Sequence, residues 1–165
     1  MKTIYLAGGC FWGTQRFFQQ FSGVKATETG YANGRTDTPS YEDVRYRDTG
    51  HAETVRIVYD EEQLPTEKLL AYYFMTIDPL SINRQGEDIG SQYRTGIYYT
   101  DDTLLPAICA AVTEEEKKVG AKLEVEVLPL RNFWPAEEYH QDYLVKNPGG
   151  YCHIPLHLMH LSEKH

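Results

Sequence analysis

Apolar and polar residues alternate along parts of this chain and recur at helical spacing in others. Residues 53–59 alternate cleanly, with Val55, Ile57 and Tyr59 on one face, which predicts a strand with one buried side. Similar blocks predict strands at residues 3–7, 24–31, 53–59, 93–99 and 124–128. Helical spacing predicts helices at residues 11–21, 66–77, 101–120 and 135–145. Thr66 is the expected N-cap of the second helix.

The order of these elements predicts the fold. Strand–helix–strand–strand–helix–strand is typical of an α+β protein, a two-layer sandwich with helices over one face of a mixed sheet and a ferredoxin-like βαββαβ core. The polar stretches at residues 33–50 and 80–92 are expected to be loops, and long ordered loops are often functional. No repeat or linker divides residues 1–165, so we expect a single domain that ends in an irregular tail at residues 155–165.

Composition narrows the class of protein. The 165 residues suit one core, and 16 Lys and Arg against 24 Asp and Glu give a net charge of −8, which disfavours a nucleic-acid partner. No run approaches the roughly 18–20 apolar residues of a membrane span, and the apolar start at residues 3–7 is too short for a signal-peptide core. Three cysteines do not favour a static disulfide framework. We therefore expect a cytoplasmic monomer with thiol chemistry and no membrane contact.

The sequence Gly-Gly-Cys-Phe-Trp-Gly at residues 8–13 places Cys10 at the start of the first predicted helix. There, unpaired backbone N–H groups and the positive end of the helix dipole favour a thiolate, which is the nucleophilic form. The glycines leave room for a substrate, and Phe11 and Trp12 are unusual at a polar turn unless they line a pocket. The alternative is an unreactive buried cysteine.

The other two cysteines have different surroundings. Cys152 follows two glycines in an irregular segment, where a mobile thiol could approach Cys10 and form a reversible disulfide if the two Cα atoms come within about 7 Å. A free surface thiol is the alternative. Cys109 lies beside core positions of a predicted helix and is expected to pack there.

A metal site near the C-terminus must also be considered. Cys152, His153, His157 and His160 lie close together in sequence, but no C-x-x-C pair accompanies them. We therefore expect no metal and interpret these histidines as part of a polar, disordered tail.

Glu53 is the candidate acid. It shares a strand face with Val55 and Ile57, so it is expected to point to the apolar side, where burial without a cation raises a carboxyl pKa and leaves a proton to donate near neutral pH. A solvated glutamate at a strand end is the alternative. Asp88 and Tyr41 lie in the two polar stretches, and either would be unremarkable without the others.

These residues resemble the A-type peptide methionine sulfoxide reductases, and the similarity runs from Tyr5 to His153. It is carried by the segments Gly9–Gly13, Thr49–Glu53, Gly86–Arg94, Tyr139–Leu144 and Lys146–Cys152. The resemblance implies reduction of methionine sulfoxide, free or in proteins, with preference for the S epimer. It implies no bound cofactor and an external reductant, thioredoxin.

The resemblance also implies roles for the residues around the sulfoxide. Cys10 would attack its sulfur, Glu53 would give a proton to its oxygen, and Tyr41 and Tyr93 would hold that oxygen by hydrogen bonds. Cys10 would become a sulfenic acid, and Cys152 would convert it to a Cys10–Cys152 disulfide that thioredoxin reduces. Many members carry a further cysteine near the C-terminus, and none follows Cys152 here, so resolution is expected in one step.

The substrate-binding residues follow from the same resemblance. Phe11 and Trp12 would enclose the methyl group, and Asp88 would orient the substrate backbone. His140 and Tyr143 are expected to support this pocket.

Three other activities use some of the same residues. A cysteine peroxidase also passes through a sulfenic acid but needs no aromatic box around a methyl group. A cysteine hydrolase with His51 or His140 as its base would not need Cys152. A tyrosine-rich peptide-binding module would consume no reductant.

Overall fold

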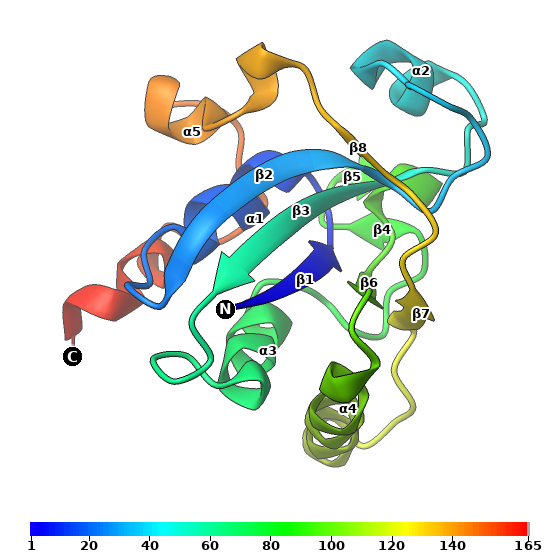
Figure 1. The fold of residues 1–165 in the computed structure, drawn as a ribbon. Coiled ribbons are helices and arrows are strands. Elements are labelled where there is room, and N and C mark those ends of the chain that lie inside the picture. The colour runs from blue at the N-terminus through cyan, green and yellow to red at the C-terminus, as the bar shows by residue number, and fades with distance from the viewer. Residues whose placement is uncertain (165) are drawn as a thin grey trace.

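The computed structural model describes residues 1–164, and its centre is a six-stranded sheet in the order β7-β6-β1-β3-β2-β8 (Figure 1). The strands are β1 (Lys2–Ala7), β2 (Val24–Ala32), β3 (Ala52–Tyr59), β6 (Gly96–Tyr99), β7 (Glu126–Pro129) and β8 (Phe133–Pro135). In the central part, β6-β1-β3-β2, every neighbouring pair is antiparallel. This is the strand order of a ferredoxin-like core, and β7 runs parallel to β6, so the predicted mixed sheet is confirmed.

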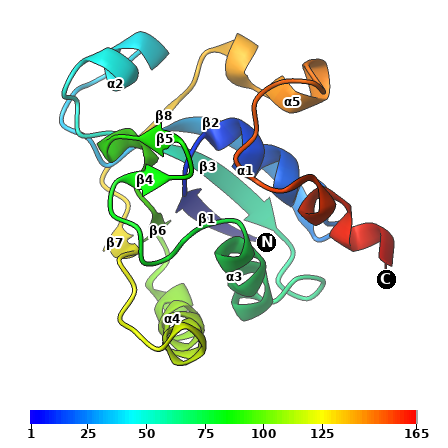
Figure 2. The same cartoon turned by 180° about the vertical axis from the view of Figure 1, so that it is seen from behind.

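Helices cover one face of this sheet. They are α1 (Phe11–Phe18), α3 (Thr66–Met75) and α4 (Leu105–Val119), the last preceded by the short 3-10 helix η2 (Asp102–Leu104). Figure 2 shows α1 and α3 in front of the strands. Ile4 and Leu6 of β1 point into this helix-covered core, while Ala7 packs with a smaller cluster that includes Phe133 on the opposite face. Alternation along β1 therefore places successive residues on opposite faces of the sheet.

The boundaries of the predicted helices are partly wrong. The first helix ends at Phe18, and Pro65 rather than Thr66 is the N-cap of α3, because the Thr66 hydroxyl donates a hydrogen bond to Glu61 instead of capping (2.6 Å). No continuous helix forms at residues 135–145. Pairing with β2 makes a strand of Phe133–Pro135, and Asp142 has a left-handed φ of 54° that interrupts helical geometry. Two short turns remain there, η3 (Glu138–His140) and α5 (Tyr143–Lys146).

The two polar stretches contain short elements that the hydrophobic pattern did not reveal. Residues 33–50 include α2 (Tyr41–Tyr46), whose start is fixed by a capping box. The Asp43 backbone N–H donates to the Ser40 hydroxyl (3.1 Å), and the Ser40 backbone N–H donates to the Asp43 carboxylate (3.0 Å). Residues 80–92 include the small hairpin of β4 (Arg84–Gln85) and β5 (Asp88–Ile89), followed by η1 (Ser91–Tyr93).

The expectation of a disordered tail is also wrong, because residues 156–164 fold back along α1 as η4 (Leu156–Lys164) (Figure 2). Leu158 and Met159 are buried, and the Gln20 side-chain amide donates to the Leu158 carbonyl (2.8 Å). This packing holds the segment before η4 against the first turn of α1. Among the described residues, no helix is long and apolar enough to cross a membrane.

Candidate active site

Cys10 lies where β1 turns into α1. The turn needs glycine, because Gly9 has a φ of +76°, and the Gly9 N–H donates to the Tyr93 carbonyl (3.2 Å), which ties η1 to the turn. Cys10 is the N-cap of α1 and is 4% exposed. The predicted position of this thiol at a helix start is confirmed.

The protonation state of Cys10 differs from the prediction. Burial is the largest effect and raises the pKa of the Cys10 thiol well above its usual value, and the charge of Glu53 adds to the rise. The backbone N–H of Trp12 lowers the pKa, as expected at a helix start, but it is outweighed. The expectation of a resting thiolate is therefore wrong, because burial in the folded core is stronger than the helix end.

Glu53 is the buried acid that the alternation in β3 predicted. It is 1% exposed, and its Oε1 accepts a hydrogen bond from the Phe11 backbone N–H (3.2 Å). Its Oε2 is buried and makes no hydrogen bond with any described residue. Burial raises the pKa of Glu53 to about 8 against the opposing effect of the Phe11 amide. Near neutral pH, this carboxyl holds a proton beside Cys10.

Two tyrosines from separate segments lie near Cys10 and Glu53. Tyr41 is the first residue of α2, and Tyr93 ends η1. Burial raises the pKa of Tyr41 to about 12 and also raises the pKa of Tyr93, and the charges of Glu53 and Cys10 act on both in the same direction. Both hydroxyls therefore remain protonated and can donate hydrogen bonds.

Glu137 is a site residue that the sequence did not single out. Its Oε2 accepts from the Tyr41 backbone N–H (3.1 Å), and its Oε1 accepts from the Tyr31 hydroxyl (2.9 Å). Burial opposes its ionisation, but these hydrogen bonds hold the pKa of Glu137 below its usual value. No sequence signal marks this position, because its partners lie about a hundred residues away.

Aromatic rings cluster around the start of α1. The Trp12 indole stacks on Tyr143 with ring centroids 3.8 Å apart and an angle of 11°, and its Nε1–H donates to His140 Nδ1 (3.0 Å). Phe11 is almost fully buried, with its ring centroid 5.6 Å from that of His140. The sequence candidates Phe11, Trp12, His140 and Tyr143 therefore come together, and His140 fixes the orientation of the indole.

Asp88, on β5, lies close enough to Cys10 and Glu53 to raise the pKa of both. Burial raises the pKa of Asp88 itself, while the Tyr151 hydroxyl and the Cys10 backbone amide lower it. This carboxyl therefore faces the Cys10 turn from the hairpin.

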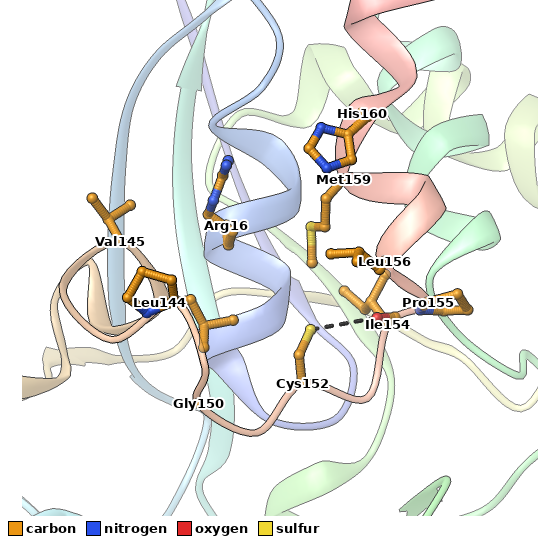
Figure 3. A pocket seen from close by; sticks show the side chains of 11 residues that line it. Arg16, Leu144, Val145, Gly150, Cys152, Ile154, Pro155, Leu156, Met159 and His160 are labelled. Atoms are coloured by element: carbon orange, nitrogen blue, oxygen red, sulfur yellow. Dashed lines mark hydrogen bonds between the residues drawn. The ribbon is translucent and has the colours of Figure 1, made fainter.

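Cys152 lies against the first turn of α1. A Cβ atom placed on Gly13, three residues after Cys10, would be 2.9 Å from the Cys152 sulfur, so only glycine leaves room for it. The Cys152 thiol donates to the Ile154 carbonyl at 3.6 Å (Figure 3), and Cys10 and Cys152 are both free thiols.

A cavity of about 640 Å³ opens beside Cys152, between α1, α5 and η4 (Figure 3). Its wall is largely apolar, with Arg16 and His160 at its edge. Cys10, Glu53 and Trp12 do not line it. The cavity therefore reaches Cys152 from a side other than that of the acid and the aromatic cluster.

The remaining candidates are placed away from this chemistry. Cys109 is exposed on α4, so the prediction that it packs in the core is wrong: the buried face of the helix runs through Ile108. His51 uses both ring nitrogens on a neighbouring loop, accepting from the Gly34 N–H at 3.1 Å and lying 2.7 Å from the Thr36 carbonyl. Among the side chains that the structure describes, those of residues 1–161, no group of three or more His, Cys, Asp or Glu is arranged to hold a metal.

Comparison with known proteins gives a consistent result. A family model described as peptide methionine sulfoxide reductase matches residues 2–164. A relative from Clostridium acetobutylicum named peptide methionine sulfoxide reductase MsrA is 54% identical, over 96% of this chain and 98% of its own length. The crystal structure of reduced Mxr1 from Saccharomyces cerevisiae superposes with a TM-score of 0.86 at 38% identity, covering 92% of this chain and 88% of that one. Mxr1 in complex with Trx2 superposes with a TM-score of 0.60 at 25% identity, covering 86% and 84%.

Proposed function

The chain belongs to the peptide methionine sulfoxide reductase family, and we propose that it reduces the S epimer of methionine sulfoxide, free or in proteins, at Cys10. It is an oxidoreductase that uses thiols to reduce methionine sulfoxide. The observation that carries the assignment of the site is the buried Glu53, which keeps its proton up to about pH 8 within electrostatic reach of the Cys10 thiol. A nucleophile and a proton donor in one buried place are what a sulfoxide requires.

The first step transfers oxygen to Cys10. The Cys10 sulfur attacks the sulfoxide sulfur, which is electrophilic once its oxygen accepts a proton. Glu53 gives its proton to that oxygen, and the resulting carboxylate accepts the proton that the Cys10 thiol releases. The hydroxyl then moves to the Cys10 sulfur as the sulfur–oxygen bond of the substrate and the transient bond between the two sulfurs break. Methionine leaves, and Cys10 is oxidised to a sulfenic acid.

The tyrosines and the aromatic cluster select the substrate. Tyr41 and Tyr93 donate hydrogen bonds to the sulfoxide oxygen, and their raised pKa values support this role because both stay protonated. Phe11 and Trp12 enclose the methyl group, and Tyr143 supports the indole by stacking. An apolar box of this kind supplies about 1–3 kcal/mol of discrimination, so the choice of epimer requires the box and the oxygen donors together.

The substrate backbone and the indole are held by two further residues. Asp88 orients the backbone of the bound methionine sulfoxide, which its position beside the Cys10 turn supports. His140 keeps the Trp12 ring in one orientation through its hydrogen bond.

The second step regenerates the enzyme. Cys152 attacks the Cys10 sulfenic acid, which gives a Cys10–Cys152 disulfide and water, and thioredoxin reduces that disulfide. The position of Cys152 against Gly13 supports this step, and the solved complex of the related Mxr1 with Trx2 supports the external reductant. In this mechanism, thioredoxin is the reductant and the protein holds no cofactor or metal of its own.

We further propose that residues 1–165 act as a single domain and as a monomer. Three free thiols, two of them in the redox cycle, suit the reducing environment of the cytoplasm.

The test measures methionine formation from each sulfoxide epimer with thioredoxin and thioredoxin reductase. We expect sustained turnover of the S epimer only, and Cys152→Ser should release about one methionine per chain without recycling. Cys109→Ser is the matched control and should turn over like the wild type, because Cys109 is exposed on α4.

Other outcomes would identify a different activity. Continued thioredoxin-driven turnover by Cys152→Ser would contradict the role of Cys152. Peroxide reduction that is indifferent to Trp12→Ala would indicate a peroxidase, and hydrolysis by Cys152→Ser would indicate a cysteine hydrolase. Binding of peptides without consumption of reductant would indicate a binding module.

A further inference from the structure

The imidazole of His153 lies against the Cys10 turn and has no part in the mechanism above. A Cβ atom placed on Gly9 would be 2.9 Å from His153 Nε2, and one placed on Gly13 would be 3.4 Å from His153 Cε1. The ring therefore packs on the backbone on both sides of Cys10. Glycine at both positions leaves the space that the ring occupies.

Neither nitrogen of this ring has a well-formed partner. His153 Nδ1 and Nε2 are both buried, neither makes a hydrogen bond of regular geometry with a described residue, and the Gly8 carbonyl is only a weak partner of the ring. Burial lowers the pKa of His153 to about 4, although the Gly8 carbonyl acts in the opposite direction. At neutral pH, the ring is thus uncharged, with one N–H that can donate and one bare nitrogen that can accept. A buried polar group without partners costs stability, and such groups are typical of functional positions.

The Cys152 thiol lies beside the same ring. The Cβ atom placed on Gly13, which would be 3.4 Å from His153 Cε1, would also be 2.9 Å from the Cys152 sulfur. Burial raises the pKa of Cys152, so this thiol does not ionise readily on its own. Its thiol donates a long hydrogen bond to the Ile154 carbonyl, at 3.6 Å. The attacking thiol, the ring and the Cys10 turn are therefore neighbours.

Formation of the disulfide requires a proton to move between the two cysteines. The Cys152 sulfur forms a bond to the Cys10 sulfur, the sulfur–oxygen bond of the sulfenic acid breaks, and the hydroxyl leaves as water only if it gains a proton. Cys152 is oxidised, the Cys10 sulfenic acid is reduced, and the Cys152 thiol supplies the proton.

We propose that His153 relays this proton, accepting it from Cys152 at one ring nitrogen and donating the proton of the other to the hydroxyl that leaves Cys10. This role rests on the proposed function, because it acts on the sulfenic acid that sulfoxide reduction forms. His153 takes no part in the first step. The relay restores a neutral ring, so it needs no external base.

The test separates the two steps in a single turnover without thioredoxin. Methionine release reports the first step, and the loss of two thiols, counted by alkylation and mass spectrometry, reports the disulfide. His153→Phe keeps a flat ring in the space but carries no proton, and His153→Gln keeps polar atoms but does not relay a proton readily. We expect both variants to release methionine like the wild type and to form the disulfide at least about ten-fold more slowly. Dimedone, which traps sulfenic acids, should then label Cys10.

The exposed His157, in the same tail, provides the matched control, and His157→Phe should match the wild type in both steps. Disulfide formation at the wild-type rate in either His153 variant would overturn the relay. In His153→Phe this rate would show that packing of the ring suffices, and in His153→Gln it would show that hydrogen bonding suffices. Loss of methionine release in both variants would place the His153 ring in the first step, and this result would also overturn the relay. If the wild-type protein releases no methionine, the proposed function fails, which this design distinguishes from failure of the relay alone.

Discussion

The Cys10 thiol and the Glu53 carboxyl both keep their protons near neutral pH, because burial disfavours the charged form of each. A resting pair of neutral groups avoids the repulsion between a thiolate and a carboxylate in a buried place. The thiolate then forms only when a bound sulfoxide takes the Glu53 proton. At the scale of the residue, burial couples the reactivity of Cys10 to the presence of substrate.

Glu53→Gln should stabilise the protein while it slows the chemistry. Glu53 loses its proton near pH 4.5 in the unfolded chain and near pH 8 in the folded protein. Between these values unfolding releases a proton, so the free energy of unfolding falls as pH rises. Removing this effect should add about 3 kcal/mol to the free energy of unfolding at pH 7, and methionine release should slow about 100-fold.

Urea unfolding at pH 4 and pH 7 and a single-turnover assay measure these effects. The gain in stability should vanish at pH 4, where the carboxyl is neutral in both states. In the wild type, methionine release should fall as pH rises through about 8, where Glu53 loses its proton. Equal release rates in the variant and the wild type would remove Glu53 from the mechanism.

Cys10 should resist alkylation although it is the nucleophile. At pH 7.5 we expect iodoacetamide to modify the exposed Cys109 at least about ten-fold faster than Cys10, because the Cys10 thiol is buried and its pKa is raised. Peptide mass spectrometry at timed intervals measures both rates, and the two cysteines should react alike in urea. Faster modification of Cys10 than of Cys109 in the folded protein would indicate a resting thiolate.

At the scale of the element, α2 depends on a distant segment for its position. Its six residues are too few to be stable alone, and its start is held by the capping box at Ser40 and by Glu137, which accepts the Tyr41 N–H. Glu137 follows β8, so the pairing of β8 with β2 also places the carboxylate that holds Tyr41. The first residue of α2, Tyr41, is therefore positioned by a contact between this helix and the segment that follows β8.

Glu137→Gln should weaken catalysis through Tyr41. An amide nitrogen replaces one of the two acceptor oxygens, so the Tyr41 N–H or the Tyr31 hydroxyl loses its partner. We expect about a ten-fold slower release of methionine and a loss of about 1 kcal/mol in the free energy of unfolding. Single-turnover kinetics and urea unfolding measure the two effects.

The adjacent Glu138 supplies the control, because its side chain is 90% exposed. Glu138→Gln should stay within about two-fold of the wild type, as expected for a surface charge. If both variants behave alike, Glu137 has no special role in placing Tyr41.

At the scale of the whole molecule, Cys152 lies between two regions. On one side is the first turn of α1, which carries Cys10, and on the other is the apolar cavity bordered by η4. A reductant can therefore reach the Cys152 sulfur through the cavity without entering the aromatic cluster around Trp12. The tail that forms η4 builds one wall of this cavity.

Leu156→Glu should impair recycling alone. Leu156 lines the cavity and is 76% exposed, so a charge there should disturb the docking of thioredoxin and not the fold. We expect the KM for thioredoxin to rise about ten-fold, with single-turnover methionine release unchanged. Val119→Glu, at an exposed apolar position on α4, should leave the KM unchanged. An unaltered KM in Leu156→Glu would show that thioredoxin approaches from another side.

The sequence by itself determined the features that depend on local pattern. Alternation along residues 53–59 assigned Glu53 to the buried face, and Gly8-Gly9 before an apolar helix located Cys10 at a strand-to-helix turn. The order of the elements was sufficient for the ferredoxin-like core, because short periodicities and chain connectivity restrict the topology.

Only the tertiary structure decided what depends on contacts between distant segments. Whether Cys10 is a thiol or a thiolate depends on burial by the whole core, which outweighs the local helix end. The strand at 133–135 forms because β2 is there to pair with it, and Glu137 acquires its role from Tyr31 and Tyr41. The tail folds on α1 and brings His153 to the Cys10 turn for the same reason. Such effects are non-local: burial and hydrogen bonding between residues a hundred positions apart leave no period in the sequence.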